Sequence, residues 1–290
     1  MIAGAPIAKV NDKPRWRPGL LTMLPAGIWL SVFMLLPVAI IAVFSLGFRD
    51  SLGNVHPGFS SDNYLRFFYG PYLLCLWRSV GLAASTTIGC LLLGFPCAAW
   101  LAFQVKPKHQ SLCVTLLTVP LWISFLLRIY AWITILRPTG LIATALTSFG
   151  ITPPEMLYNQ SAVFLGMLYN YLPYMILPLY STLEKLDKRF LEAAQDLGAN
   201  TITTFLRVTV PLSKRGIVAG VIMVFVPSLG DYVTPDLMGG AKYMYIGSLI
   251  QNQFLVVHDW AFGSAVSTIL LVLVGIGIWV YLKYGEAEIA

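Results

Sequence analysis

Long apolar segments alternate with short polar segments along the whole chain of 290 residues. A helix needs about 20 predominantly apolar residues to cross the hydrocarbon core of a bilayer, and six of the segments reach that length with little or no charge. Inside lipid every backbone N–H and C=O group must be paired within the protein, which a helix achieves within a single segment. The pattern therefore predicts an all-α integral membrane protein with six transmembrane helices.

The polar interruptions set approximate bounds for these spans. Several spans contain proline, which membrane helices tolerate because neighbouring helices can satisfy the carbonyl groups that proline leaves unpaired. We expect one membrane domain over residues 20–283, between a basic tail at 1–19 and a short tail at 284–290. The predicted spans are Leu20–Gly47, Leu76–Phe103, Ser111–Leu136, Ser161–Leu183, Gly216–Leu237 and Trp260–Leu282.

The first apolar segment is too long to be a cleaved signal peptide. It carries no charged residue between Pro18 and Phe48, whereas the apolar core of a signal peptide is roughly 7–15 residues long. We therefore expect it to remain in the protein as the first span.

The charged residues support the membrane assignment and indicate an orientation. Charged residues make up 11% of the chain and hydrophobic residues 57%, whereas soluble domains carry about 25% charged residues. The lysines and arginines gather in residues 1–19, at Lys106 and Lys108, and in residues 184–215. Because positively charged loops stay in the cytoplasm, both termini are predicted to be cytoplasmic. The net charge of +6 does not indicate nucleic-acid binding, which requires basic residues gathered on one face.

Motifs for metal binding, nucleotide binding and catalysis are missing from the sequence. The three histidines share no spacing with one another or with the cysteines. There is no G-x-x-x-x-G-K-[ST] phosphate-binding loop and no catalytic cluster within a span. We therefore expect a protein that is not an enzyme and binds no cofactor itself. The cysteines, which we interpret as small hydrophobic residues of the spans, are Cys75, Cys90, Cys97 and Cys113.

The longest polar interruption lies between the fourth and fifth spans, over residues 184–215. Asp187 can cap a helix that begins at Lys188, because its carboxylate can accept hydrogen bonds from the first free N–H groups. Gly198 stands where the end of that helix needs a residue in the left-handed conformation. The stretch is therefore predicted to start with a short helix and a tight turn near residues 188–200.

A second short helix is expected after the turn. Asn200 or Thr201 can cap its start, and Pro211 is expected to lie just beyond its end, because proline has no N–H group for the helix. In the first helix Glu192 and Asp196 are four residues apart and share a face. The unit is therefore predicted to project into the cytoplasm, tied to spans four and five, as a docking surface for another protein.

The spacing of this unit resembles the EAA motif of ATP-binding-cassette (ABC) importer permeases. That motif reads E-A-A, three residues, G, nine residues and I-x-L-P. The chain has Glu192-Ala193-Ala194, then Gly198, then Val208-x-Val210-Pro211. Valine thus stands in place of both the isoleucine and the leucine of the motif. E-A-A alone is common in helices, but the full spacing between spans four and five of a six-span protein is specific.

Three further blocks are similar to the spermidine/putrescine-type branch of these permeases. They are residues 126–132 (LLRIYAW), 171–180 (YLPYMILPLY) and 228–240 (SLGDYVTPDLMGG). The pair Asp259-Trp260 before the last span fits the same branch. The resemblance covers most of the chain and implies import of a polyamine, or a related cationic or amino-acid-like compound, across the inner membrane.

The resemblance implies the type I importer permease fold, also called MetI-like. A second permease subunit, often a different chain, would line the pathway with this one. Two cytoplasmic ATPase subunits would bind ATP and Mg, and an extracytoplasmic solute-binding protein would deliver the solute. The polar unit between spans four and five would be the coupling helix, seated in a cleft of an ATPase. The residues implied in coupling are Glu192, Ala193, Ala194, Asp196, Gly198 and Ala199.

Asp231 is the sharpest candidate for contact with the solute. A carboxylate within a span is costly and usually faces a cavity or a partner, and Pro227 and Gly230 can open the helix beside it. A carboxylate that faces the pore suits a cationic solute. The alternatives are a salt bridge to Arg128 or to the partner permease, and a position at the membrane edge. Asp236 is interpreted as a solvated helix end.

Aromatic and polar side chains near Asp231 complete the candidate pathway. Arg128 either contributes to the pathway or extends its head group to the membrane interface. Aromatic rings can bind amines through cation–π contacts, although rings at helical spacing are more often packing or interface residues. The candidate pathway residues are Asp231, Tyr232, Tyr169, Asn170, Tyr174, Arg128 and Trp132.

A secondary transporter with its own ion coupling is the alternative function. Such transporters are commonly built from inverted repeats, and the chain has only six spans and no evident internal repeat. The polar unit between spans four and five, which is suited to docking another protein, also favours the importer permease.

Overall fold

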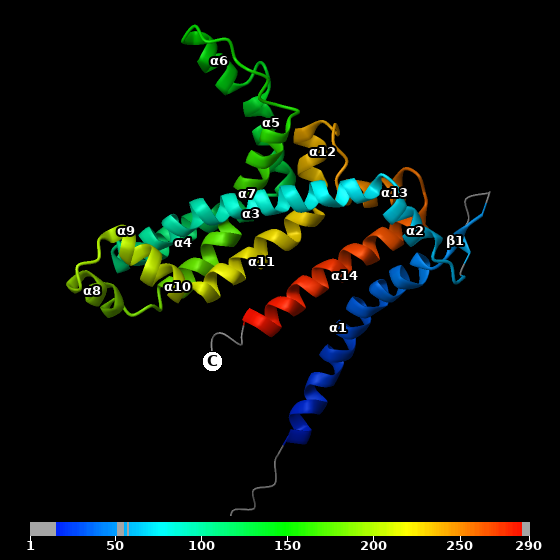
Figure 1. Ribbon diagram of the computed structural model, residues 1–290, viewed down its shortest axis with the longest axis horizontal. Coiled ribbons are helices and arrows are strands. Elements are labelled where there is room, and N and C mark those ends of the chain that lie inside the picture. Colours follow the sequence, from blue (N-terminus) through cyan, green and yellow to red (C-terminus); the bar gives the residue numbers. More distant parts are fainter. Residues whose placement is uncertain (1–15, 51–54, 57, 286–290) are drawn as a thin grey trace, which may run out of the picture.

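The computed structural model describes residues 16–50, 55–56 and 58–285, and this part of the chain is mostly helical (Figure 1). The two short strands β1 (Phe48–Arg49) and β2 (Val55–His56) form an antiparallel pair. The helices are α1 (Trp16–Ser45), α2 (Asp62–Tyr69), α3 (Tyr72–Phe103), α4 (Pro107–Trp122), α5 (Phe125–Leu136), α6 (Leu141–Ser148), α7 (Gln160–Leu183), α8 (Arg189–Asp196), α9 (Thr201–Thr204), the π-helical turn η1 (Phe205–Thr209), α10 (Val210–Leu212), α11 (Lys214–Gly230), α12 (Val233–Gly239), α13 (Ile246–Leu255) and α14 (Trp260–Gly285).

Five helical segments in the described residues are long and apolar enough to cross a membrane, and a sixth is obtained if one bent pair counts as a single span. The bent pair joins residues 201–212 to residues 214–230 at 72°. The predicted all-α membrane fold is therefore confirmed. The five segments are Met23–Ser45, Tyr72–Phe103, Phe125–Ser148, Gln160–Leu183 and Trp260–Trp279.

The third span differs from its prediction as one helix over Ser111–Leu136. The structure has two helices there, α4 and α5, because Ile123 and Ser124 adopt extended backbone with ψ angles of 137° and 134°. Pro120 lies in the last turn of α4, and proline lacks the N–H group that would continue the hydrogen-bond ladder. The apolar segment that is long enough to cross the membrane instead runs from Phe125 to Ser148 and includes α5 and α6. The helix α6 thus lies in residues 137–160, the loop expected between the third and fourth predicted spans.

The fifth span is also broken, and the prediction of one helix over Gly216–Leu237 is wrong. The helix α11 ends at Gly230, Asp231 is extended with a ψ angle of 121°, and α12 begins at Val233. Pro227 and Gly230 lie just before the break, as expected for residues that open a helix. The break places the Asp231 carboxylate outside any regular helix.

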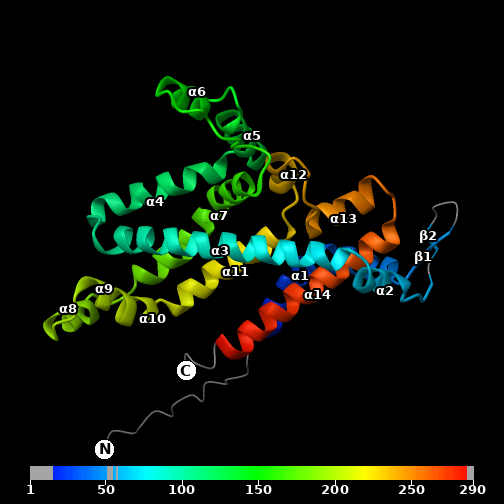
Figure 2. The ribbon, with the colours of Figure 1, turned by 45° about the horizontal axis from the view of Figure 1, so that its top comes forward.

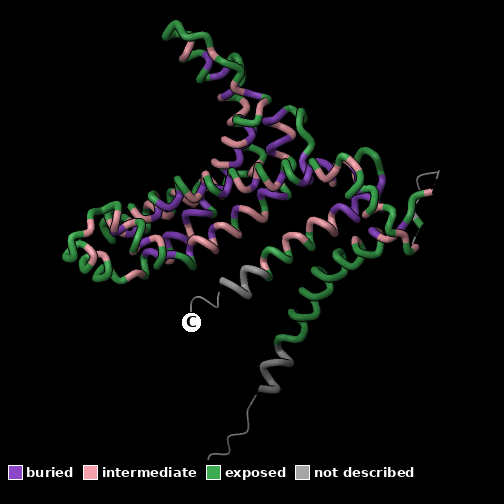
Figure 3. Tube along the Cα trace, viewed as in Figure 1, coloured by how far each residue is buried: buried purple, intermediate pink, exposed green. Residues whose placement is uncertain are grey.

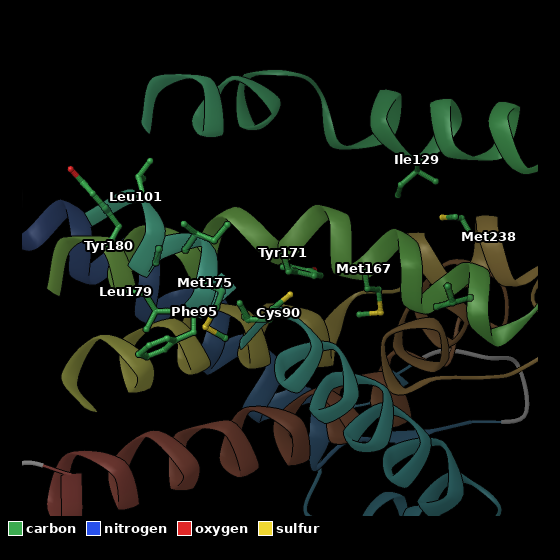
Figure 4. Packing of buried hydrophobic residues seen from close by; sticks show 14 of the residues in the cluster. Cys90, Phe95, Leu101, Ile129, Met167, Tyr171, Met175, Leu179, Tyr180 and Met238 are labelled. Carbon is green, nitrogen blue, oxygen red and sulfur yellow. The ribbon is translucent and has the colours of Figure 1, made fainter. Parts of the chain in front are cut away.

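The helices α3, α7 and α11 pack along one another and form the main core (Figures 1 and 2). Two glycines of α11 permit this approach: a Cβ on Gly216 would lie 2.8 Å from the Thr182 Cβ atom, and one on Gly220 would lie 2.6 Å from the Met175 Sδ atom. Small residues at such contacts are typical of membrane helix pairs. Figure 4 shows the buried side chains of this core, which include Cys90, Phe95, Met167, Tyr171 and Leu179.

A second, smaller core joins α2, α13 and α14 to the start of α3. The Arg66 Nη1 atom of α2 donates a hydrogen bond to the Asp259 Oδ2 atom at 2.8 Å, and the guanidinium lies 4.1 Å from the centre of the Phe262 ring. The Asp259 Oδ1 atom accepts a hydrogen bond from the Phe262 N–H at 3.1 Å and so caps α14. The buried residues of this core are Phe67, Leu76, Ile246, Leu249, Phe262 and Val266.

The helix α1 lies beside α14 and is exposed over most of its described length (Figure 3). Its apolar side chains Trp29 and Leu35 are more than half exposed. An uncovered apolar helix of this length suits contact with lipid or with another membrane subunit. Because α1 begins at Trp16 and α14 ends at Gly285, most of the two predicted tails lies outside the described residues.

Candidate coupling helix and solute pathway

The predicted helix and turn of the polar unit are present in α8 and the residues after it. The helix α8 begins at Arg189, whose N–H donates to the Asp187 Oδ1 atom at 3.0 Å. Gly198 has a φ angle of 83°, the left-handed conformation that glycine adopts without steric cost. The Ala199 N–H then donates to the Ala194 carbonyl at 3.0 Å, which closes the helix end in the manner of a Schellman turn.

The second helix of the unit differs from the prediction at its end. Asn200 caps α9, because its Oδ1 atom accepts a hydrogen bond from the Thr203 N–H at 2.8 Å. The helical path does not stop before Pro211 but continues through η1 and α10 to Leu212. Proline cannot donate to a carbonyl in the preceding turn, and the wider π-helical turn lets the chain pass this point without a break.

The unit lies at one end of the molecule, beyond the ends of α7 and α11 (Figures 1 and 2). Glu192, Ala193 and Asp196 are exposed, whereas Ala194 is half-buried. Large apolar side chains are exposed beside them, with Leu197 exposed to 89%. Such a patch on an otherwise polar unit is typical of a protein interface. Its other members are Phe190, Ile202, Leu206 and Leu212.

Asp231 lies at the break between α11 and α12 and is held by two neighbouring side chains. The Thr234 Oγ1 atom donates to the Asp231 Oδ2 atom at 2.6 Å, and the Thr234 N–H donates to the Oδ1 atom at 3.2 Å. The Tyr171 hydroxyl of α7 donates to the Oδ2 atom at 3.4 Å. The carboxylate is therefore fixed in position while the residue stays partly accessible.

Arg128 and Asn170 are buried without hydrogen-bond partners for part of their side chains. Arg128 is 7% exposed, and its Nε and Nη1 atoms are unpaired. Asn170 is 1% exposed, and both of its side-chain polar atoms are unpaired. Unpaired buried polar groups are costly and point to hydrogen-bond partners on a ligand, on a partner chain or in another conformation of this chain. Whether the Arg128 head group extends to the membrane interface stays a prediction, since the structure contains no membrane.

The predicted alternative of a salt bridge between Asp231 and Arg128 is wrong for the described residues. The Asp231 carboxylate is hydrogen-bonded to hydroxyl groups instead, and the Arg128 guanidinium lies 5.8 Å from the centre of the Phe125 ring. The two charged side chains therefore have different neighbours and form no ion pair with each other.

The candidate aromatic residues form separate contacts. The Trp132 and Tyr169 rings meet edge to face, with centroids 5.5 Å apart. The Tyr174 ring lies 6.4 Å from the Tyr171 ring, centroid to centroid, and Tyr171 in turn donates to Asp231. Tyr232 follows Asp231 directly in the chain and is 40% exposed. Of the seven pathway candidates, the structure thus connects Tyr174 to Asp231 through Tyr171, leaves Tyr232 at the break, and pairs Trp132 with Tyr169.

The residues that hold the break, Tyr171 and Thr234, lie within the sequence blocks 171–180 and 228–240, but the sequence does not predict either as a site residue. The signal that could identify Tyr171 is its hydroxyl, since a buried tyrosine hydroxyl needs a hydrogen-bond partner. Asp236 is not a solvated helix end, because its Oδ1 atom accepts a hydrogen bond from the Ser248 Oγ atom of α13 at 2.7 Å. A Cβ on Gly247 would lie 2.5 Å from the Gly230 carbonyl oxygen. The helix α13 therefore packs directly onto the break.

Comparison with known proteins shows the family of the chain. Residues 2–283 match the family model described as the binding-protein-dependent transport system inner membrane component. The chain is 40% identical, over 88% of its length and 90% of the relative, to the spermidine/putrescine transport system permease protein PotB of Haemophilus influenzae. It is 41% identical to the Escherichia coli protein of the same name, over 87% of this chain and 92% of the relative.

More distant similarity extends to another permease and to solved structures. The chain is 29% identical to the inner membrane ABC transporter permease protein YdcU of Escherichia coli, over 79% of this chain and 77% of the relative. A chain of a bacterial ABC transporter that imports the acidic polysaccharide alginate superimposes with a TM-score of 0.70 at 15% identity, over 93% of this chain and 97% of that one. At this identity the likeness shows the fold, which is that of ABC importer permeases.

Proposed function

Since the chain belongs to the family of binding-protein-dependent transport system inner membrane components, we propose that it carries spermidine, putrescine or a closely related polyamine across the inner membrane. The chain is a multi-pass permease subunit of an ABC importer and not an enzyme. Hydrolysis of ATP with Mg takes place on partner ATPase subunits, and this chain binds no cofactor itself.

The identity to the named spermidine/putrescine permeases carries the proposal about the solute. It reaches 40–41% and extends over nearly the whole length of both chains. Asp231 adds a chemical argument, because a fixed carboxylate at a helix break within the membrane attracts a protonated amine. The neighbouring rings of Tyr171 and Tyr174 can add cation–π attraction once the amines are desolvated.

We propose that the solute passes the break between α11 and α12. Tyr232 and Tyr174 are partly exposed near Asp231, and Trp132 with Tyr169 forms an aromatic wall on α5 and α7. Arg128 and Asn170 keep unpaired polar atoms nearby, which can serve the solute or the facing permease subunit in another conformation. In this arrangement the carboxylate selects for positive charge, and the aromatic residues fit the alkyl segments of the solute.

The unit from Arg189 to Leu212 is proposed to be the coupling element. Its exposed apolar side chains Leu197, Ile202 and Leu206 and the carboxylates Glu192 and Asp196 would enter a cleft of an ATPase. The unit continues directly into α11, which ends at Gly230 next to Asp231. A movement of the ATPase would therefore be transmitted along α11 to the break at which the solute is bound.

The partners and the orientation follow the same proposal. A second permease subunit, two ATPases and an extracytoplasmic solute-binding protein would complete the importer, and a chain superimposable on this one belongs to a complex with a periplasmic protein. Both termini are proposed to be cytoplasmic, because the basic residues gather on the side that carries α8. The apolar face of α1 would then meet lipid or the second permease.

Uptake by cells tests the proposed solute. A strain without its own polyamine importer would receive this chain together with its partner subunits, and labelled spermidine, putrescine, an amino acid and a sugar acid would be compared. We expect accumulation of spermidine or putrescine that excess unlabelled polyamine abolishes. Accumulation of the amino acid or the sugar acid without polyamine uptake would overturn the assignment of the solute and leave the family membership intact.

A further inference from the structure

A pocket of about 570 Å³ opens where α7 ends and α11 begins. Its polar wall comes from Ser181 and Thr182 in the last turn of α7, from Lys185 just after it, and from Arg215 in the first turn of α11. The end of α7 and the start of α11 lie at the end of the helix bundle that carries α8 (Figures 1 and 2), whereas Asp231 follows the other end of α11. It is therefore separate from the proposed pathway.

The charge of this pocket is positive and not neutralised within the chain. Lys185 and Arg215 are exposed and make no ion pair with any described residue. Asp187 is the acidic residue in the lining, and its Oδ1 atom accepts the hydrogen bond that caps α8. The start of α11 and the end of α7 both line the pocket, so that the opposite ends of their helix dipoles offset one another. The pocket thus presents the two cations of Lys185 and Arg215 to one volume.

The other walls of the pocket are apolar. They come from Leu186, Phe190 and Leu212, and the last two are exposed to 57% and 46%. A soluble anion gains no binding free energy from these apolar side chains. The glycerol and upper acyl carbons of a lipid, in contrast, can cover the side chains and remove them from water. The span α7 ends at Leu183, and α11 begins at Lys214. Because the pocket lies at these ends of two spans, we expect it at the depth of the lipid headgroups.

From these features we propose that the pocket binds the phosphate of an anionic phospholipid, with Lys185 and Arg215 as the groups that contact it. Basic pockets between transmembrane helices at the membrane surface are suited to such headgroups, and an arginine can hold a phosphate by two hydrogen bonds. The bound headgroup joins the end of α7 to the start of α11, the two helices that carry the coupling unit. The inference requires that the chain spans a membrane, and it does not depend on which solute is transported.

Lipid retention on the assembled importer tests this site. The complex of this chain with its second permease subunit and ATPases would be placed in nanodiscs of phosphatidylcholine with increasing phosphatidylglycerol, and retained lipid would be measured by native mass spectrometry after release. We expect saturable retention of phosphatidylglycerol on this chain. The double variant Lys185→Gln with Arg215→Gln is expected to weaken it roughly thirtyfold, the factor that two basic residues near an anionic membrane contribute.

Two further variants separate a specific site from a general effect of charge or folding. Lys106→Gln with Lys108→Gln removes the same charge from the start of α4, outside the pocket, and is expected to leave retention unchanged. Lys185→Arg with Arg215→Lys keeps both charges and is expected to retain the lipid. Equal retention by the double Gln variant and the unchanged protein would overturn the proposal, and so would an equal loss in the control.

The same assay distinguishes a lipid headgroup from a soluble phosphate and from a surface of the ATPase. Inorganic phosphate at millimolar concentration is expected not to displace the lipid, since it cannot cover Phe190 and Leu212. Displacement by phosphate would show a soluble anion site in place of a lipid site. Retention by the permease pair alone that is lost in the complex with the ATPases would show that a protein surface fills the pocket, and this outcome would also overturn the lipid assignment.

Discussion

The Tyr171 hydroxyl of α7 donates a hydrogen bond to the Asp231 carboxylate at 3.4 Å, and this contact links two spans at the point where one of them is broken. The Thr234 hydroxyl, at 2.6 Å from the same carboxylate oxygen, fixes the other side of the break. The helix α11 runs from the coupling unit to the break at Asp231. Sliding of α11 against α7 would therefore change the contact between Tyr171 and Asp231 and leave the contact between Thr234 and Asp231 intact. The carboxylate can thus be available to a solute in one conformation and held by tyrosine in another.

Replacement of Asp231 by Asn is expected to raise the half-saturation concentration for spermidine uptake by about tenfold or more. A charge-assisted hydrogen bond contributes about 1.5–3 kcal/mol, and each 1.4 kcal/mol is a factor of ten in affinity. Asp236→Asn removes the same charge five residues away while an amide oxygen can still accept from Ser248, and it is the matched control. Initial rates of labelled spermidine uptake measure both. Identical kinetics for Asp231→Asn and the unchanged protein would exclude Asp231 from the pathway.

Replacement of Gly198 by Val is expected to weaken the coupling unit. Its φ angle of 83° costs a residue with a Cβ atom about 1–2 kcal/mol, and a Cβ there has open space around it, so that the strain is local. Co-purification of the ATPase and solute uptake are both expected to fall. Asn tolerates this conformation better, and Gly198→Asn should keep most of both.

Reversal of charge in the same unit tests its contact with the ATPase separately from its conformation. Glu192→Lys alters an exposed side chain of α8 and leaves the Gly198 turn intact. We expect loss of ATPase co-purification with unchanged thermal stability of the permease. Normal uptake in both Glu192→Lys and Gly198→Val would contradict the coupling assignment.

Replacement of Gly216 by Ala is expected to lower the stability of the helix bundle. The added Cβ would lie 2.8 Å from the Thr182 Cβ atom and 3.0 Å from the Pro178 carbonyl oxygen, and overpacking of this kind costs about 1–3 kcal/mol. Gly275 of α14 has nothing within 4 Å of such a Cβ, so that Gly275→Ala is the control. A lower melting temperature in detergent for Gly216→Ala alone is the expected result, and equal melting temperatures would show that α7 and α11 are not closely packed there.

Replacement of Arg66 by Ala is expected to release α2 from α14. The change leaves the Asp259 carboxylate, 7% exposed in its side chain, without its cation, and hydrogen bonds to charged groups contribute about 1.5–3 kcal/mol. Because the Arg66 side chain is 45% exposed, screening by solvent places the loss at the lower end of that range. Proteolysis between α2 and α3 should become faster, and Arg66→Lys should restore part of the protection. Unchanged proteolysis in Arg66→Ala would show that the Asp259 contact does not hold α2.

The sequence predicts the class of fold because its main signal, the length of each apolar segment, is local. The caps at Asp187 and Asn200 and the left-handed Gly198 are local as well, and the structure confirms all three. The effect of prolines is harder to predict, since it depends on the surrounding turn. The helix that contains Pro120 ends two residues later. The helical segment that contains Pro211 is not interrupted before it, because the π-helical turn η1 leads directly into α10.

Contacts between distant parts of the chain could not be predicted from local patterns. Arg66 and Asp259 are 193 residues apart, and Tyr171 and Asp231 are 60 apart. An intramembrane carboxylate indicates that a partner exists, but several residues can satisfy it, and the sequence indicates Arg128 or the partner permease without singling out Tyr171. Arg128 and Asn170 are buried because α5 and α7 pack against their neighbours. The spacing of apolar residues along the sequence does not predict this packing.

Transport in proteoliposomes tests the central claim most directly. The permease with its second subunit and ATPases would be reconstituted with ATP trapped on the ATPase side, and the solute-binding protein with labelled spermidine would be added on the other side. We predict spermidine accumulation that requires both ATP and the binding protein and is unaffected by collapse of ion gradients. Accumulation that persists without ATP and follows an imposed ion gradient would contradict this account and favour a secondary transporter.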